Sequence, residues 1–187
     1  MSKSDRIDVY LVAGGKYHNI DHARLEILKL LAEQPRIKVQ VGADYSDIDA
    51  ICNSDFLITY TCDLRPSIEE QAALGEFLEN GGRWFALHAT NALLEFVGDK
   101  VDTPDIAPKF MELLGSRFVA HPANQRIQIR VTDVDHPLTQ SIEDFEVDDE
   151  EPYYCEPQGK QTVLLEASYH ERSVGYVQSD YGIDRDS

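Results

Sequence analysis

Three histidines lie at positions where an α/β protein normally keeps its chemistry. His18, His88 and His121 each stand where the chain leaves a predicted extended segment. In open α/β sheets, ligands bind just beyond the carboxyl ends of the strands. Imidazole is a ligand for Zn²⁺ and other divalent metals, and it also transfers protons near neutral pH. The three side chains therefore predict a shared metal or acid–base site; the alternative is that each is an ordinary loop histidine bonded to the backbone.

Two of these histidines are expected to approach each other across a sheet. If the strand order is of the flavodoxin type, one strand separates the strand before His18 from the strand before His88. Neighbouring strands lie about 4.8 Å apart, so the two carboxyl ends lie about 10 Å apart. Two imidazoles on loops can span that distance around a metal ion or a small substrate, although no His-Glu-x-x-His spacing is present.

The acidic segment 143–151 is the second candidate for chemistry. The chain has no Lys or Arg between Val131 and Gly159, and a run of like charges is typical of a solvated face or loop. Yet Glu151 is followed by Pro152, which favours a rigid turn, and by the aromatic ring of Tyr153. A carboxylate beside Tyr153 predicts a general base, or an oxygen ligand that completes a mixed nitrogen and oxygen set for Zn²⁺ or Mn²⁺.

The three cysteines are far apart in the sequence. Their odd number and the absence of a Cys-x-x-Cys pair predict no disulfide framework, which indicates a reducing cytoplasm. Cys62 ends a predicted strand and is the best placed to act as a nucleophile, so a cysteine hydrolase is a third, lesser candidate. The favoured interpretation of all three is a small buried structural thiol.

The hydrophobic pattern predicts a mostly parallel sheet with helices on both faces, in a single domain over residues 1–187. Strands are expected at residues 7–13, 37–41, 55–61, 84–87, 125–131 and 162–167, with the run 84–87 buried. Helices are expected after residue 19, after the capping-box residue Ser67, at 109–114, as one short turn within 44–54, and after His88.

The apolar face of the first helix comprises Leu25, Ile27, Leu28 and Leu31. Residues 95–108 are expected to form a loop, and the tail 178–187 is expected to be disordered or a truncated end.

The composition disfavours several classes of function. The chain carries 34 acidic and 17 basic residues, a formal net charge of −17, and this field repels nucleic-acid phosphates and anionic membrane surfaces. It favours neutral or cationic ligands and metal ions, although such charge also serves solubility alone. No apolar run is long enough to span a bilayer, and the first residues show no signal-peptide core, so a cytoplasmic protein is expected.

Five short motifs follow one another along nearly the whole chain. They are Gly14-Gly15-x-x-His18, Gly81-Gly82 followed by Leu87-His88-Ala89, His121-Pro122, Asp133-x-x-His136-Pro137-Leu138-Thr139 and Glu151-Pro152-Tyr153. Together they resemble the motifs of the ThuA-like family, named for trehalose utilisation, within the class I glutamine amidotransferase-like superfamily. Tyr17, Ala86 and Glu150 replace residues usual in that family, and the chain stops after Tyr181-Gly182, where the family continues into a closing strand and a Gly-His pair.

The resemblance implies a flavodoxin-like, doubly wound α/β fold. It also implies that His88 occupies the elbow at which amidotransferases carry a cysteine, so glutaminase activity is not expected. It further implies chemistry on trehalose or a related oxidised disaccharide.

Two functions are compatible with these residues. In the first, the protein is an enzyme acting on a small carbohydrate, with His88, Glu151 and Tyr153 as catalytic residues and His18, His88 and His121 as ligands of a divalent metal, Zn²⁺ or Mn²⁺, where one is bound. In the second, it is a non-catalytic module that binds a sugar or a partner protein. A bare edge strand would also invite pairing with a second copy of the chain.

Overall fold

The computed structural model describes residues 6–183 and divides the chain into two compact units, which are treated separately below. Unit 1 comprises the chain as far as Leu93 together with Asp105–Leu114. Unit 2 comprises Leu94–Pro104 and the chain from Gly115 onward. In the part of the chain that is described, no helix is long and apolar enough to cross a membrane.

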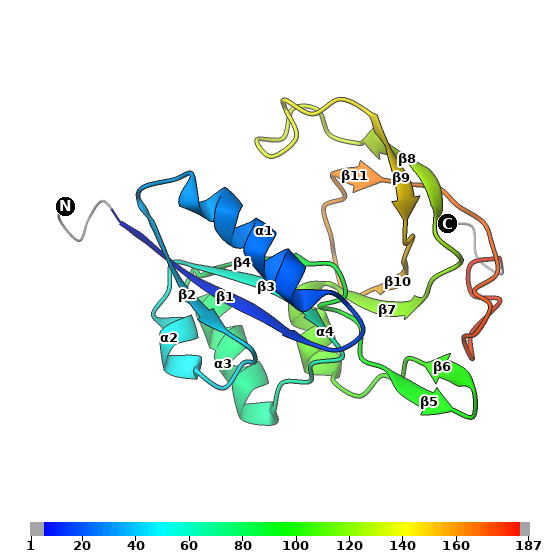
Figure 1. The fold of residues 1–187 in the computed structure, drawn as a ribbon, viewed down its shortest axis with the longest axis horizontal. Coiled ribbons are helices and arrows are strands. Elements are labelled where there is room, and N and C mark those ends of the chain that lie inside the picture. The colour runs from blue at the N-terminus through cyan, green and yellow to red at the C-terminus, as the bar shows by residue number, and fades with distance from the viewer. Residues whose placement is uncertain (1–5, 184–187) are drawn as a thin grey trace. The chain divides into compact units, whose positions relative to one another are not determined.

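Unit 1 is built on a parallel sheet with the strand order β2-β1-β3-β4 (Figure 1). Its strands are β1 (Ile7–Gly15), β2 (Ile37–Gly42), β3 (Phe56–Cys62) and β4 (Arg83–Leu87). Its helices are α1 (Ile20–Ala32), α2 (Ile48–Cys52), α3 (Ile68–Glu79) and α4 (Pro108–Leu114). The order confirms the flavodoxin-type prediction that one strand, β3, separates β1 from β4.

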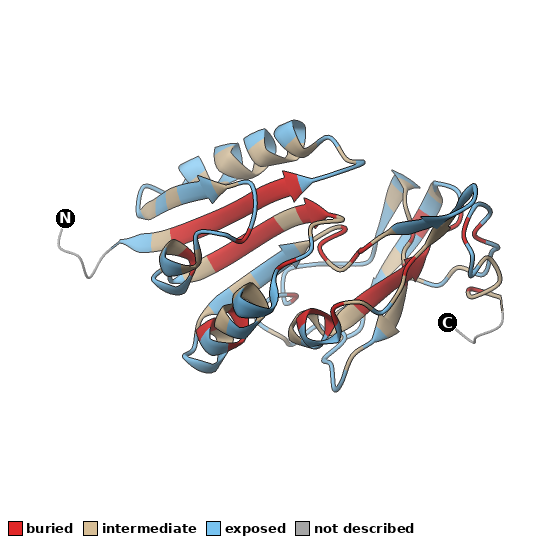
Figure 2. Cartoon of the chain, turned by 90° about the horizontal axis from the view of Figure 1, so that it is seen from below, coloured by how far each residue is buried: buried red, intermediate tan, exposed pale blue. Residues whose placement is uncertain are grey.

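The two central strands are apolar on both faces because helices cover both faces. Val9 and Leu11 of β1 belong to a core cluster with Ile27, Leu28 and Leu31 of α1. The alternate residues of β1 face a second cluster, in which the fully buried side chains include Val12, Ile51 of α2, Leu74 of α3 and Phe110 of α4. Both central strands are buried along most of their length (Figure 2), which confirms the doubly wound α/β prediction.

Two details of unit 1 correct the expectations. The prediction that β4 is buried is wrong, because β4 is an edge strand paired with β3 and Phe85 is 54% exposed. His88–Asn91 form a turn instead of opening a helix. An apolar run alone does not distinguish a central strand from an edge strand, which explains the first error.

The helix starts follow the capping residues of the sequence. Asn19 accepts a hydrogen bond from the backbone N–H of His22 and caps α1, and Ser67 with Glu70 forms the predicted capping box of α3. Leu25 does not join the buried apolar face of α1, since this residue is 52% exposed. Its neighbours Ile27 and Leu28 take the inward-facing positions instead.

Unit 2 consists of short antiparallel pairs. A hairpin joins β5 (Glu95–Val97) to β6 (Lys100–Asp102), β7 (Ser116–Ala120) pairs with β10 (Tyr154–Pro157), and β8 (Gln125–Val131) lies between β9 (Phe145–Glu150) and β11 (Leu165–Glu166). The predicted loop 95–108 therefore contains a hairpin, and most of the acidic segment is strand β9.

The end of the chain is structured as far as it is described. The predicted strand 162–167 is reduced to β11, and residues 178–183 form turns, with Gly182 packed against the ring of Tyr154 so closely that a Cβ there would overlap it. The tail 178–187, predicted to be disordered or a truncated end, is therefore described only over 178–183, and residues 184–187 lie outside the described part.

Replacing Gly75 with alanine is expected to stabilise unit 1. Gly75 lies inside α3, and an added Cβ would meet Leu113 and Lys109 only at ordinary van der Waals distances of 3.8 and 3.9 Å. Alanine in a helix interior is more stable than glycine by about 0.5–1 kcal/mol. Urea unfolding of Gly75→Ala followed by circular dichroism would measure the gain, and a loss of stability would contradict the expected packing.

Candidate functional site

The end of β1 delivers His18 through a tight turn. Gly14 and Gly15 bring the backbone so close to neighbouring segments that a Cβ at either position would overlap a backbone carbonyl, that of Ala43 or that of Cys62. Gly15 has a φ of 104°, in a region where only glycine is unstrained. The backbone N–H of His18 then donates to the carbonyl of Lys16 at 2.9 Å, which closes the turn.

A buried network of hydroxyl groups fixes the turn that carries His88. The hydroxyl of Thr90 donates to the carbonyl of Leu87 at 2.6 Å and lies 3.1 Å from the hydroxyl of Thr59 on β3. The indole N–H of Trp84 donates to the same Thr59 hydroxyl at 3.0 Å. The bonds of Trp84 and Thr90 to Thr59 thus hold Leu87, the last residue of β4, and the turn after it against β3.

The residue with left-handed backbone at this elbow is Ala89, with a φ of 59° and a buried side chain, and not His88. A strained strand-end turn is where hydrolases of related architecture expose a nucleophile. Here the position carries only a methyl group, and His88 stands immediately before it. The sequence alone could not show whether residue 88 or residue 89 adopts the left-handed conformation, because neither residue type determines its backbone angles.

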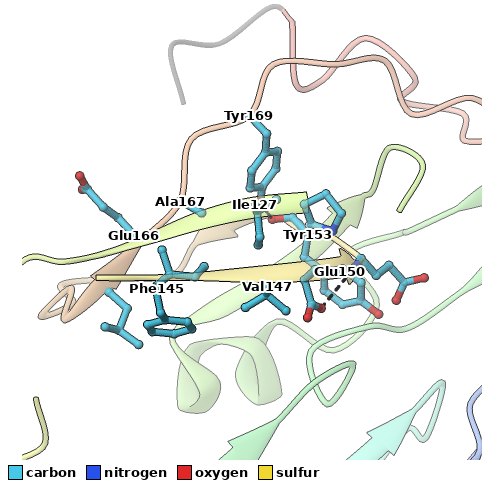
Figure 3. A pocket seen from close by; sticks show the side chains of 12 residues that line it. Ile127, Phe145, Val147, Glu150, Tyr153, Glu166, Ala167 and Tyr169 are labelled. Carbon is cyan, nitrogen blue, oxygen red and sulfur yellow. Dashed lines mark hydrogen bonds between the residues drawn. The ribbon is translucent and has the colours of Figure 1, made fainter. Parts of the chain in front are cut away.

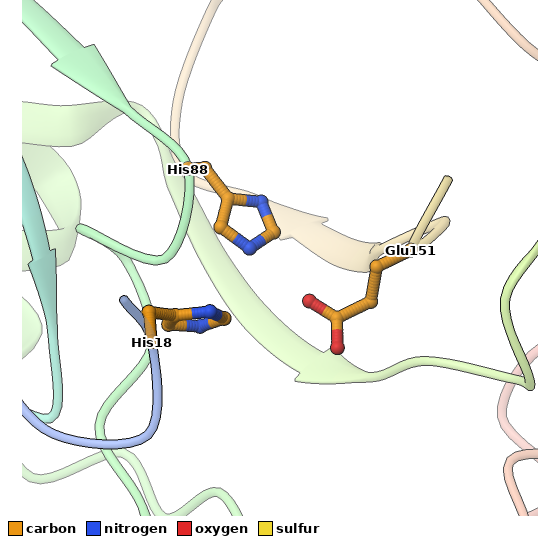
Figure 4. A group of neighbouring side chains, drawn as sticks. All are labelled: His18, His88 and Glu151. Carbon is orange, nitrogen blue, oxygen red and sulfur yellow. The ribbon is translucent and has the colours of Figure 1, made fainter. Parts of the chain in front are cut away.

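The structure brings His18 and His88 together at the carboxyl ends of β1 and β4 (Figure 4). Their ring centroids lie 4.7 Å apart with an interplanar angle of 79°, and one nitrogen of each ring lies within 4.8 Å of a nitrogen of the other. The ring of Tyr60, from the intervening strand β3, lies 6.4 Å from His18 and 6.2 Å from His88. Tyr60 was not identified from the sequence, although its place near the end of β3 was a usable signal.

A hollow of about 390 Å³ borders His18 in unit 1. It is lined by Ala13, Gly14, Gly15, His18, Asn19, Ile20, Asp21, Arg24 and Ala43. Beside the loop of His18, the ammonium group of Lys16 bonds the carboxylate of Asp63 at 2.8 Å. This hydrogen bond, together with the carboxylate charge, raises the pKa of Lys16 above its ordinary value. The hollow and the Lys16–Asp63 ion pair therefore lie beside His18, whereas His88 is not among the residues that line this hollow.

In unit 2, both ring nitrogens of His121 are engaged. Nδ1 lies 2.7 Å from the carbonyl oxygen of Pro122, and Nε2 lies 3.0 Å from a carboxylate oxygen of Glu151. Because a carbonyl oxygen only accepts, Nδ1 must donate, and the carboxylate then receives a second N–H when the ring is protonated. An Nδ1–H bond to a carbonyl is also the usual support of a histidine whose Nε2 binds a metal. The arrangement suits a proton carrier as well as a metal ligand.

Aromatic side chains hold the His121–Glu151 pair in place. The ring of Tyr153 stacks on His121 at a centroid distance of 5.8 Å and an interplanar angle of 19°. The ring of Tyr176 meets His121 edge-on at 5.2 Å, and Phe118 packs on Tyr153 at 4.2 Å. Of the residues predicted from the sequence, the structure thus groups His18 with His88 in unit 1, and His121, Glu151 and Tyr153 in unit 2.

A second hollow, of about 320 Å³, lies in unit 2 against β8, β9 and β11 (Figure 3). It is lined by Ile127, Ile129, Phe145, Val147, Glu150, Glu151, Pro152, Tyr153, Leu165, Glu166, Ala167 and Tyr169. Burial raises the pKa of Tyr169 well above its ordinary value, so this phenol stays protonated, and its hydroxyl donates to the carbonyl of Tyr153. The sequence pointed to Glu151 and Tyr153 of this lining, but no sequence pattern indicated the apolar wall of the hollow.

The three cysteines differ in burial. Cys62 is buried, as expected, at the end of β3, Cys155 is only partly buried, and the prediction of burial is wrong for Cys52, which is exposed. Partial desolvation and the nearby charges of Glu76 and Asp49 raise the pKa of the Cys52 thiol, which opposes formation of the thiolate.

Replacing Thr90 with valine is expected to destabilise the His88 turn by about 2 kcal/mol. The substitution keeps the shape but removes a buried hydroxyl that bonds the carbonyl of the partly buried Leu87 and lies 3.1 Å from the hydroxyl of the buried Thr59. Thr132→Val is the matched control, because its hydroxyl bonds a carbonyl at an exposed site and the loss should stay below about 0.5 kcal/mol. Urea midpoints of the two variants would test the difference, and equal losses would contradict a role of the buried network.

A four-stranded parallel sheet with helices on both faces, carrying candidate functional side chains beyond the strand ends, defines a flavodoxin-like α/β protein. The chain belongs to the ThuA family, described as trehalose utilisation, whose family model matches residues 8–182.

Solved structures share this fold. A ThuA-like protein from Bacteroides uniformis is 21% identical, with a TM-score of 0.69 over 90% of this chain and 70% of the other. A ThuA-like protein from Parabacteroides merdae is 15% identical, with a TM-score of 0.61 over 87% of this chain and 68% of the other. No curated protein matches the chain.

Proposed function

We propose that the protein acts on a small carbohydrate, of the trehalose type or a related oxidised disaccharide, by histidine-centred chemistry with a divalent metal. The observation that carries the proposal is the convergence of His18 and His88, from β1 and β4, to a ring distance of 4.7 Å. Membership of a family described as trehalose utilisation supports the carbohydrate class.

The donor chemistry of the His18–His88 pair fits Zn²⁺ or Mn²⁺. Imidazole nitrogens suit these ions, and a complete set needs at least one or two further nitrogen or oxygen ligands. A carboxylate, water or a sugar hydroxyl supplies such an oxygen. A metal bound there would act as a Lewis acid on a sugar oxygen. His121 is the third ligand predicted from the sequence, and its Nδ1 bond to Pro122 is the support that a metal-binding histidine requires.

The proposal assigns proton transfer to Glu151 and Tyr153. The carboxylate of Glu151 is paired with His121, and the ring of Tyr153 is stacked on that imidazole. A carboxylate held against an imidazole can accept a proton from a sugar hydroxyl and pass that proton to Nε2 of the neutral ring. The proposal excludes glutaminase activity, because Ala89 occupies the elbow and offers no nucleophile.

A second candidate is a non-catalytic module that binds a sugar or a protein. The methyl side chain at the elbow favours it, since the scaffold then lacks the group that gives this kind of turn its usual reactivity.

Metal analysis of purified variants tests the metal part of the proposal. Wild-type protein is expected to bind one Zn²⁺ or Mn²⁺ per chain, and His18→Ala and His88→Ala are expected to weaken binding at least about 100-fold. His22→Ala is the matched control, because His22 is exposed on α1 only four residues from His18 and should leave the affinity unchanged. His121→Ala, assayed alongside, tests the third predicted ligand. If His18→Ala, His88→Ala and His121→Ala all bind metal as tightly as wild-type protein, the assignment of these ligands is overturned.

Turnover of neutral and oxidised disaccharides tests the catalytic part. Glu151→Gln and Tyr153→Phe are each expected to lower turnover by about 100-fold or more while the circular dichroism spectrum stays the same. Sugar binding without turnover in metal-loaded wild-type protein would reject the enzyme and favour the binding module.

A further inference from the structure

A β-bulge in β9 turns Glu150 toward the hollow of unit 2. Along β9, Phe145 and Val147 line the hollow, while Glu146 and Asp148 point the other way and pair with Arg126. Strict alternation would put Glu150 with the outward set. The pairing instead runs from Val147 opposite Ile127 to Glu150 opposite Gln125, so between these two pairs β9 carries one residue more than the facing part of β8.

The extra residue has the backbone signature of a bulge. Asp149 adopts a φ of 55°, in the left-handed region that costs a side-chain-bearing residue energy. Bulges of this kind re-aim side chains and are frequent beside functional sites. Here the bulge places Glu150 on the same face as Val147, where it joins the lining of the hollow (Figure 3).

The hollow combines an apolar wall with negative charge. Its wall is formed by aliphatic side chains and aromatic rings, and its charged groups are the carboxylates of Glu150, Glu151 and Glu166, with no Lys, Arg or His in the lining. Glu151 pairs with His121, and Glu166 pairs with Arg130. Glu150 accepts a bond from the backbone N–H of Glu151 and has no basic partner among the described residues. One carboxylate charge at the hollow therefore lacks a basic partner within the described part of unit 2.

We propose that this hollow binds a ring-shaped organic cation, a protonated primary amine of the amino-sugar class. The ammonium group pairs with Glu150, and the apolar face of the ring packs on Val147, Ile127 and the nearby aromatic rings. A charge-assisted hydrogen bond and an aromatic neighbour both favour a cation. The volume of about 320 Å³ is at the lower end of ligand sites and admits one sugar ring.

This inference deepens the proposed function, because Glu151 and Tyr153 line the same hollow. It rests on the proposed function only for the identification of the ligand as a sugar. The charge preference rests on Glu150 and the bulge alone. The carbohydrate function and the cation preference of the hollow can therefore be disproved independently.

Calorimetric titration with four probes tests the inference. Glucosamine, glucose and glucuronate share a ring and differ in charge, and cyclohexylamine carries the ammonium on a ring without hydroxyls. Glucosamine is expected to bind about tenfold more tightly than glucose, and glucuronate is expected not to bind. The advantage of glucosamine should shrink as salt is raised, since part of it is an ion pair.

Variants of neighbouring glutamates locate the effect. Glu150→Gln is expected to remove the tenfold advantage of glucosamine over glucose. Glu146→Gln is the matched control, because it removes the same charge from the outward face of the same strand, where Glu146 pairs with Arg126. Circular dichroism confirms that both variants are folded, and the four-probe comparison on wild-type protein needs no variant.

The outcomes separate the two proposals. Equal affinity for glucosamine, glucose and glucuronate would overturn the cation site and leave the carbohydrate function standing. Binding of cyclohexylamine with no sugar bound would retain the cation site and overturn the carbohydrate assignment. Equal loss of glucosamine binding in Glu150→Gln and Glu146→Gln would overturn the role of Glu150.

Discussion

Replacing Gly14 with alanine is expected to destabilise the protein by about 3 kcal/mol or more. The added Cβ would overlap the carbonyl oxygen of Ala43, a backbone atom that no side-chain rotation can move away. Because typical domains are stable by only about 5–15 kcal/mol, a loss of this size is a large fraction of the total. Urea unfolding at 25 °C would measure it.

The Gly75→Ala variant provides the control for this prediction. Glycine is also replaced by alanine at Gly75, where the added Cβ makes only ordinary van der Waals contacts within a helix, so stability should rise. Opposite signs at the two glycines would show that the close approach at the end of β1, and not the loss of glycine as such, sets the cost. If Gly14→Ala lowers the free energy of unfolding by less than about 1 kcal/mol, the backbone around Ala43 shifts at little cost and the prediction is wrong.

Replacing Arg117 with methionine is expected to destabilise unit 2 by about 3 kcal/mol. The Arg117 side chain is only 11% exposed, and its guanidinium donates to Glu156 at 2.7 and 3.2 Å and to the carbonyl of Thr103 at 2.6 Å. It thereby joins β7 to β10 and to the segment that follows β6. Methionine keeps the length of the stem but removes all three bonds.

Arg126→Met is the matched control for Arg117. Arg126 also bridges two carboxylates, those of Glu146 and Asp148, but its side chain is 65% exposed. Exposed ion pairs contribute about 0–1 kcal/mol, so this loss should be small. Equal urea midpoints for the two variants would show that burial does not determine how much each arginine contributes to stability.

The parallel sheet of unit 1 could be predicted because its signals are local. Buried runs such as Ile7–Ala13, the capping box at Ser67 and the left-handed stop at Gly81 each specify one element without reference to the rest of the chain. Unit 2 was harder, because β9 is an acidic strand whose composition is typical of a loop. Its pairing with β8 overrides that local preference.

The candidate site was predicted in part for the same reason. The ends of β1 and β4 can be placed from hydrophobic runs, so the approach of His18 to His88 follows from the strand order. Glu150 could not be assigned to the hollow, because its orientation depends on a single left-handed residue, Asp149. Tyr176 could not be assigned either, since its contact with His121 depends on a bridge between Tyr176 and Val101 across 75 residues of chain, a separation that no local pattern encodes.

The route of the chain has a consequence for synthesis. The polypeptide leaves unit 1 at Leu93 and returns to it only for Asp105–Leu114, where Phe110 and Met111 fill the core beside Tyr45 and Leu74. A nascent chain that has emerged as far as β4 therefore has all four strands of the sheet but an open hydrophobic face. Domains tend to fold as units during translation, so here the first unit can close only after part of the second has left the ribosome.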